Sequence, residues 1–360
     1  MKRLSTSQLI PGMQVSEDVL SIDHQMILPK GSFLTDKSIS KLEMYAVMTV
    51  YVNDDAPDQI STSGEVQQTP SYSAWVKSSE EFKLFQAHYE KEVETFKSVM
   101  NEVVTRNTEF NVYQLLSEAL AVSASANGKV SILDMLQNMR NYDDTTYAHC
   151  MNVGLICNVF SKWLKLTEQQ TELATACGLF HDIGKLLVPN SIITKPGKLS
   201  ELEFMEVKKH PQMGFQLLRS KNVDAHICNA ALMHHERCDG TGYPLRLKRE
   251  RIDFYAKMVA IADVYDAMTA ARVYRGPMCP FKVIDIFESE GLQKYDVHFI
   301  MTFLENVANT YIHNRCQLSD GRTGDIIFIN HSQLSRPVVQ CRNEYVDLSK
   351  HTELNVESLL

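Results

Sequence analysis

Side chains suited to metal binding are concentrated in one part of the chain. Six of the twelve histidines lie between His149 and His235. Seven residues of this region combine a metal-ligand side chain with a position on an otherwise apolar helix face or at a helix end: His149, His181, Asp182, His210, His234, His235 and Asp263. Burying an unpaired carboxylate is costly, whereas divalent cations would compensate the charge and accept the imidazole lone pairs. The pattern therefore predicts a metal site.

The local sequence gives these residues inward or terminal positions. His149 shares a predicted helix face with Val153, Ile156 and Phe160, and Asp263 shares one with Ala256, Val259 and Ala267. His210 precedes Pro211, and proline is favoured in the first turn of a helix. A single inward histidine is usually a hydrogen-bonded core residue. Five histidines and two aspartates in such positions together favour metal ligands over independent core positions.

The number of ligands indicates two metal ions. Four protein ligands fill one site, so seven suggest two ions that share a carboxylate, and Asp182 is the natural bridge. Two ions about 3.5–4 Å apart activate a bridging water and neutralise phosphoryl oxygens. Lys185, one helical turn beyond His181, could donate to a phosphate or a leaving group, or could be a solvated lysine at a helix end. Imidazole and carboxylate ligands leave iron, manganese, zinc, cobalt and nickel open.

Helices are expected to position these residues, because helical periodicity dominates residues 110–315. Before them, one long helix is predicted from Trp75 to about Arg106. Its apolar stripe recurs at steps of three and four and consists of Phe82, Phe85, Tyr89, Val93, Phe96, Met100 and Val103. The stripe fits either a helix packed on its own domain or a dimer and signalling helix.

The two ends of the chain have a different character. Residues 1–54 predict a small mixed α/β module, with strands in VSEDVL, QMILPKGSF and VMTVYVND and a helix capped by Thr35. Residues 55–74 have the composition of a linker. After Cys316, a glycine-containing turn and β-branched runs predict a β-hairpin-like extension. The expected fold is mainly α, with segments 1–54, 55–74, 75–108, 109–315 and 316–360.

Composition narrows the classes of partner. The formal net charge of −8 argues against binding to long nucleic acid but allows a small anionic ligand held by local Arg and Lys. No apolar run is long enough to span a membrane, and the N-terminus lacks the apolar stretch of a signal peptide. We therefore expect a cytoplasmic protein without a membrane partner. Its eight cysteines, which form no C-x-x-C pair, are expected to be reduced thiols.

Two motifs carry a family resemblance. HDIGK at 181–185 and HHERCDGTGYP at 234–244 resemble the motifs of the HD-GYP family of cyclic di-GMP phosphodiesterases, and the resemblance covers about 110–315. It implies an all-helical HD-type domain that hydrolyses a cyclic dinucleotide by attack of a hydroxide that bridges two ions, iron or manganese. One ion would be held by His149, His181, Asp182 and Asp263, and the other by Asp182, His210, His234 and His235.

The resemblance also implies roles outside the ligand set. Lys185 would polarise the scissile phosphate. Arg272 and Arg275 match positions that contact phosphates or guanine in the family, although they could also form an exposed basic helix end. The GYP loop, 239–244, is expected to supply two glycines with positive φ and a fixed proline, as architecture and as a docking surface for a signalling partner.

One position departs from the family pattern. Some members place a glutamate that helps to hold a third metal four residues before the first metal histidine, and here that position is Thr145. Asp144 is adjacent but about 100° further round the helix. We therefore expect a binuclear site and accumulation of linear pGpG, with slow or no conversion to GMP.

Two other functions stay open at this stage. The same chemistry could act on cyclic GMP-AMP or another cyclic dinucleotide, or the domain could be a non-catalytic nucleotide-binding module. Retention of all seven ligands and of Lys185 favours an enzyme.

Overall fold

The structure, a computed structural model, describes residues 2–5, 9, 13–20, 26–34, 38, 42, 49–53, 72–106, 108–109, 111–126, 131–139, 146–195, 199–270, 278–342 and 344–360. The chain divides into two compact units, one formed chiefly by Met1–Ser71 and one formed by Tyr72–Cys341 together with Tyr345–Leu360. Each unit has its own apolar core. All seven predicted metal ligands belong to the second unit.

The N-terminal unit contains two pairs of antiparallel strands. β1 (Lys2–Ser5) pairs with β4 (Thr49–Val52), and β2 (Val19–Leu20) pairs with β3 (Met26–Leu28). Three of these strands lie in the predicted segments, whereas β1 was not predicted because KRLS lacks an apolar alternation. Ser38 and Leu42 are helical, but Thr35 and most of the helix predicted after it lie outside the described residues.

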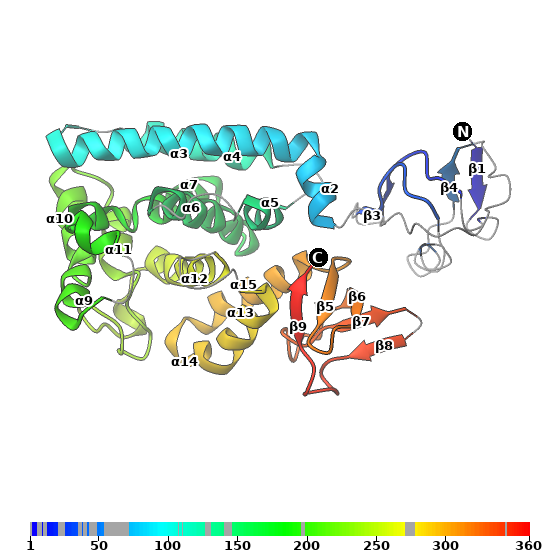
Figure 1. Cartoon of the computed structure of the whole chain (residues 1–360). Helices are drawn as coiled ribbons and strands as arrows, with labels where there is room; N and C mark the ends of the chain where they lie inside the picture. The colour runs from blue at the N-terminus through cyan, green and yellow to red at the C-terminus, as the bar shows by residue number, and fades with distance from the viewer. Residues whose placement is uncertain are drawn as a thin grey trace. The chain divides into compact units, whose positions relative to one another are not determined.

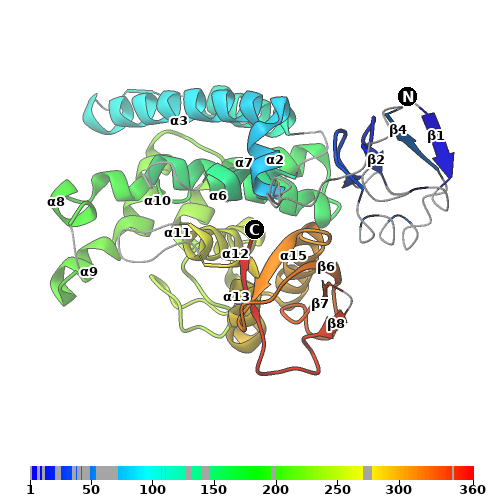
Figure 2. The ribbon, with the colours of Figure 1, turned by 45° about the vertical axis from the view of Figure 1, so that its right-hand side comes forward.

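The second unit is mainly helical, which confirms the predicted fold class. In Figures 1 and 2, α6 lies between α3 and α12, and α13 lies beyond α12. Among the described residues, no helix is long and apolar enough to cross a membrane. The helices of this unit are α2 (Tyr72–Ser78), α3 (Glu80–Arg106), α4 (Val112–Ser125), α5 (Ile132–Met139), α6 (Thr146–Trp163), α7 (Glu168–Phe180), α8 (Asn190–Ile193), α9 (Glu201–Val207), α10 (His210–Ser220), α11 (Ala225–Met233), α12 (Phe254–Thr269), α13 (Pro280–Ile286), α14 (Leu292–Lys294) and α15 (Val297–Thr310).

The single helix predicted from Trp75 to about Arg106 is interrupted at Ser79, so that prediction was wrong at its N-terminal end. The hydroxyl of Ser79 donates to the carbonyl of Val76 and accepts from the amide of Phe82 at 3.1 Å. Ser79 is therefore the N-cap of α3. The apolar spacing continues across this cap, which is why periodicity alone did not reveal the break.

The apolar stripe of α3 is buried inside the helical unit. Phe82, Phe85, Tyr89, Phe96, Met100 and Val103 are all buried there. The hydroxyl of Tyr89 also donates to Asn152 of α6 at 2.7 Å. The stripe thus contributes to the core of its own unit, and a dimer that used α3 would need another face of the helix.

Polar caps determine where several site-bearing helices begin. Thr167 and Gln170 form a capping box before α7. The carboxylate of Asp253 accepts from the amide of Tyr255 at 2.9 Å, at the start of α12. α10 begins at His210 with Pro211 in its first turn, as predicted. These local signals fix the register in which each helix presents its ligands.

The C-terminal residues form a five-stranded antiparallel sheet rather than a single hairpin. Its order is β8–β7–β6–β5–β9. The turn between β5 and β6 supplied the predicted hairpin signal, but the pairing of β9 with β5 joins segments about forty residues apart and leaves no local signal. The strands are β5 (Arg315–Leu318), β6 (Thr323–Phe328), β7 (Val338–Cys341), β8 (Glu344–Asp347) and β9 (Val356–Leu359).

Candidate metal centre

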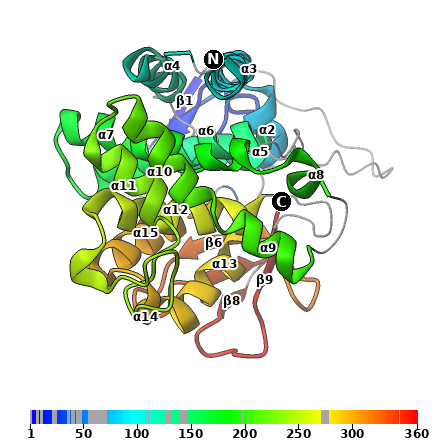
Figure 3. The same cartoon turned by 90° about the vertical axis from the view of Figure 1, so that its left-hand side faces the viewer.

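Five helices bring the seven predicted ligands into one cluster. α6 carries His149 and α12 carries Asp263, while the other ligands lie at the end of α7, the start of α10 and the end of α11. Figure 3 shows α10 and α11 side by side next to α12. We call these residues the His/Asp cluster: His149, His181, Asp182, His210, His234, His235 and Asp263. Five of them are buried, and His149 and His235 are half-buried.

Asp182 lies at the centre of the cluster, with different imidazoles near each oxygen. Its Oδ1 is 3.2 Å from Nε2 of His210 and 3.5 Å from Nε2 of His234. Its Oδ2 is 3.5 Å from Nε2 of His181 and 3.7 Å from Nε2 of His149. One carboxylate therefore lies between two groups of nitrogen ligands.

The backbone determines which nitrogen of each buried imidazole faces the cluster. Nδ1 of His181 lies 2.7 Å from the carbonyl of Gly178, and Nδ1 of His210 lies 2.7 Å from that of Val207. Nδ1 of His234 lies 3.0 Å from the carbonyl of Ala231. A carbonyl oxygen accepts only, so each Nδ1 carries a hydrogen, and in the neutral ring each Nε2 presents a lone pair to the cluster.

The described residues supply no hydrogen-bond donor for those lone pairs. Nε2 of His181 is buried without a hydrogen-bond partner in this part of the chain. Nε2 of His210 and Nε2 of His234 face each other at 3.2 Å, and in the neutral rings both are acceptors. A cation satisfies both observations, because each lone pair can coordinate it. The donor set of nitrogen and carboxylate oxygen suits divalent transition metals.

The donor atoms fall into overlapping groups whose members lie close enough together to hold a metal ion. One possible ligand atom from each of Asp182, His210, His234 and His235 lies within 4.8 Å of the others, and the same holds for His149, His181 and Asp182 and for His181, His234 and Asp263. Asp263 approaches the second group, with Oδ1 at 3.1 Å from Nε2 of His149. The cluster could therefore hold metal ions.

The pKa values of the imidazoles in the cluster are shifted in different directions. Burial lowers the pKa of His234 to about 4. Burial, and after it the repulsion that would arise between two protonated rings, lowers the pKa of His235 well below its usual range. Both rings are neutral near pH 7 and can act as ligands. For His149, burial lowers the pKa, but hydrogen bonds to Asp263 and Asp266 raise it to about 10. A metal ion at His149 must therefore displace a proton.

Both cluster carboxylates are ionised. Burial raises the pKa of Asp182 and Asp263, but nearby cationic groups, chiefly Lys185 for Asp182 and His149 for Asp263, hold both pKa values well below their usual range. The ammonium of Lys185 forms an ion pair with the carboxylate of Asp182, and its side chain is partly exposed. Lys185 therefore lies at the edge of the cluster, with access to solvent.

The sequence interpretation missed two buried acidic residues beside the cluster. Asp266 is buried and lies 2.8 Å from Nδ1 of His149, and one of its oxygens has no hydrogen-bond partner among the described residues. Glu236 is buried and accepts from the amides of Leu245 and Leu247 at 2.6 and 2.8 Å, which holds the GYP loop. The available signals were the i, i+3 spacing of Asp266 from Asp263 and the acidic residue directly after the histidine pair.

Gly240 and Gly242 of the GYP loop are required for different structural reasons. Gly240 has φ +84°, as expected for a turn glycine, whereas φ at Gly242 is not positive, so that part of the prediction was wrong. A Cβ on Gly242 would lie 2.5 Å from Cα of Glu236, so space rather than dihedral angle requires glycine there. The loop passes close to the helix end that carries His234 and His235.

Four predicted positions lie outside the described residues: Asp144, Thr145, Arg272 and Arg275.

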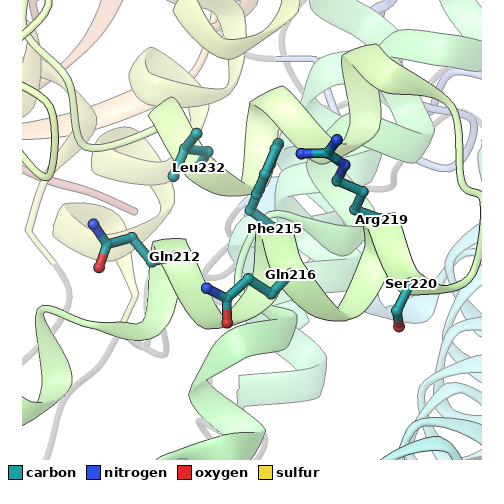
Figure 4. A pocket seen from close by; sticks show the side chains of 6 residues that line it. All are labelled: Gln212, Phe215, Gln216, Arg219, Ser220 and Leu232. Atoms are coloured by element: carbon teal, nitrogen blue, oxygen red, sulfur yellow. The ribbon is translucent and has the colours of Figure 1, made fainter.

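A separate open pocket of about 630 Å³ lies on α10 and α11 and is lined by Gln212, Phe215, Gln216, Arg219, Ser220 and Leu232. Figure 4 shows these side chains, and no cluster residue is among them. The pocket is therefore distinct from the candidate metal centre.

Comparison with known proteins gives a family match and named relatives. The model of a family described as "HD domain" matches residues 118–298. The chain is 34% identical over 220 residues to a cyclic di-GMP phosphodiesterase of Pseudomonas aeruginosa, covering 61% of this chain and 53% of the relative. It is 36% identical over 167 residues to 3'3'-cGAMP-specific phosphodiesterase 1 of Vibrio cholerae, covering 45% of this chain and 39% of the relative. The chain thus spans about half or less of the length of these relatives.

A fold comparison gives a solved structure of an HDG"Y"P protein from Bdellovibrio bacteriovorus. The match covers 85% of this chain and 99% of that one, with a TM-score of 0.48 and 16% sequence identity.

Proposed function

The chain belongs to the HD domain family, and from that premise we propose that it is a metal-dependent phosphodiesterase that hydrolyses cyclic di-GMP. The observation that supports this most strongly is the position of Asp182, whose two oxygens face different groups of imidazole nitrogens. Such a carboxylate suits a pair of ions acting on a phosphodiester. The name of the Pseudomonas relative supplies the substrate class.

We propose two divalent ions, iron or manganese, in the His/Asp cluster. His149, His181, Asp182 and Asp263 would hold one, and Asp182, His210, His234 and His235 would hold the other. When bound, such a pair supplies an activated water and neutralises charge on the phosphoryl oxygens. The orphaned Nε2 of His181 and the facing nitrogens of His210 and His234 support this assignment.

The chain's own residues would bind and orient the substrate around this centre. Lys185 lies at the exposed edge of the cluster, from which its ammonium can donate to a phosphate oxygen. Arg272 and Arg275 remain proposed contacts to phosphate or guanine, on the family resemblance of their positions. We also propose a homodimer that forms through residues 75–108. A signalling protein would dock on the GYP loop.

A second substrate is favoured by a specific observation. A relative with similar identity is named for 3'3'-cGAMP, so cyclic GMP-AMP is the alternative substrate for the same chemistry.

With Thr145 at the position of the third-metal glutamate, we propose that the first product, linear pGpG, accumulates.

The experiment replaces Asp182 by alanine in the metal-loaded protein. Because one carboxylate serves both ions, Asp182→Ala should lose most bound metal and essentially all hydrolysis of cyclic di-GMP, while the helical circular dichroism is retained. Asp320→Ala, which removes an exposed carboxylate, is the control and should change neither quantity. Two metals per chain and near-normal turnover in Asp182→Ala would refute the assignment.

A further inference from the structure

A lysine and two aromatic rings lie next to one another, and one of the rings contacts the His/Asp cluster. The ring of Tyr243 stacks on the ring of His235, with centroids 4.7 Å apart and an interplanar angle of 28°. The ammonium of Lys208 lies 5.0 Å from the ring centroid of Tyr243 and 4.8 Å from that of Phe204. Lys208 also precedes the cluster residue His210 by two positions. The three side chains therefore form one contiguous group that reaches the cluster through Tyr243 without belonging to it.

The charge of Lys208 is not neutralised by a carboxylate among the described residues, in contrast to its neighbours. Lys195 pairs with Glu203 at 2.7 Å, and Lys209 pairs with Glu206 at 2.5 Å. Lys208 instead contacts ring faces, which stabilise a cation but accept no conventional hydrogen bond. Its three N–H donors thus remain available to a ligand with acceptor atoms.

The aromatic surface beside this cation is accessible. Phe204 is 48% exposed, and the ring of Tyr243 is partly exposed beside the centre. Exposed aromatic rings bind unpaired nucleic-acid bases by stacking. A lysine ammonium recognises guanine through the acceptors O6 and N7. The combination matches a planar base that presents two acceptors on one edge.

We propose that Phe204, Lys208 and Tyr243 form a guanine-binding subsite of the substrate site, in which the base takes the place of the ammonium on the exposed ring of Phe204 and Lys208 donates to the O6/N7 edge of that base. This inference rests on the proposed function. Adenine presents an amino donor in place of O6, so an ammonium that serves guanine disfavours adenine. The two named relatives act on cyclic di-GMP and 3'3'-cGAMP according to their names, and both molecules contain guanine.

The test compares Lys208→Met with Lys209→Met in the metal-loaded full chain. The control removes the same charge from the adjacent residue, whose ammonium is already paired with Glu206. Kinetics are measured with cyclic di-GMP, cyclic di-AMP and bis(p-nitrophenyl) phosphate, a diester without a base. Calorimetric titration with GMP and with AMP gives a readout that does not depend on turnover.

Lys208→Met should raise KM for cyclic di-GMP and weaken GMP binding about tenfold, while kcat and hydrolysis of the nitrophenyl diester stay within about twofold. Preference for the guanine substrate over cyclic di-AMP should fall by a similar factor, and Phe204→Ala should weaken GMP and AMP binding together. Lys209→Met should resemble the wild type.

Three outcomes would overturn the subsite. Unchanged KM and GMP affinity in Lys208→Met would exclude a contact with the base. Equal weakening of guanine and adenine ligands would assign Lys208 to a phosphate. Hydrolysis of the nitrophenyl diester by the wild type without hydrolysis of any cyclic dinucleotide would instead refute the proposed function, and with it the subsite.

Discussion

The backbone of Gly184 is packed against the carbonyl group of His210. A Cβ atom on Gly184 would overlap the carbonyl oxygen of His210 and would lie 2.6 Å from the amide nitrogen of Gly214. The glycine of the HDIGK motif therefore allows the start of α10 to approach the turn that follows Asp182. This close approach brings Nε2 of His210 to 3.2 Å from the carboxylate of Asp182.

Gly184→Ala should consequently displace His210 from the cluster. We expect the free energy of unfolding to fall by about 3 kcal/mol, because the clashing atoms belong to the backbone and cannot rotate away. Metal content should fall as well. Chemical denaturation and metal analysis measure the two effects.

Gly214→Ala is the matched control on the facing helix. Its Cβ would meet its nearest atom at 3.1 Å, so we expect a loss of only about 1 kcal/mol. Equal stability of the two variants would contradict the packing argument.

Asp266 should act through His149 rather than on the substrate. Its carboxylate accepts from Nδ1 of His149 and so orients Nε2 toward Asp263. Asp266→Ala should weaken metal binding about 10–100-fold. Asp266→Asn keeps an acceptor oxygen and should weaken it less.

Metal affinity measured by competition with a chelator distinguishes these variants. Asp253→Ala, which removes a cap on the same helix outside the cluster, should lower stability without changing metal affinity. If Asp266→Ala bound metal as tightly as the wild type, the hydrogen bond to His149 would have no role in ligation.

Much of the candidate site could be predicted because the positions of its residues on their helices follow from local sequence patterns. The inward face of His149 follows from apolar residues at helical spacing, and the helix start at His210 follows from Pro211. Residue type and position thus indicated the seven residues that the structure brings together.

The remaining features depend on contacts between segments distant in the sequence. Asp266 acquires its role only through a ring on α6, more than one hundred residues earlier. Glu236 shapes the GYP loop by accepting amides from residues further along the chain. Likewise, β9 completes the sheet by pairing with β5. Periodicity and turn signals report local structure and carry no information about such partners.

Lys185 is expected to contribute to turnover more than to metal binding. Its ammonium neutralises Asp182 and is partly exposed at the edge of the cluster. In Lys185→Met the metal ions would compensate Asp182, so metal content should persist while kcat for cyclic di-GMP falls about 100-fold. Lys162→Met, at an exposed position on α6, serves as control. Loss of metal in Lys185→Met would show that Lys185 supports the ligands instead.

We expect the residue at position 145, here Thr145, to determine the end product of the reaction. The second cleavage must accommodate a flexible dinucleotide with a new terminal phosphate, which carries nearly two charges when ionised. Two ions committed to the scissile phosphate cannot also hold that group, so pGpG should accumulate and Thr145→Glu should speed formation of GMP. Chromatography of a time course measures both products. Rapid and complete conversion to GMP by the wild type would contradict this prediction.

The most direct test of the binuclear phosphodiesterase is an anaerobic titration of metal-free protein with iron or manganese, in which bound metal and cyclic di-GMP hydrolysis are measured together. Because Asp182 lies between two groups of ligands, we predict that hydrolysis develops fully only as the second equivalent binds. Full activity at one equivalent, or no hydrolysis of any cyclic dinucleotide with two equivalents bound, would contradict the account.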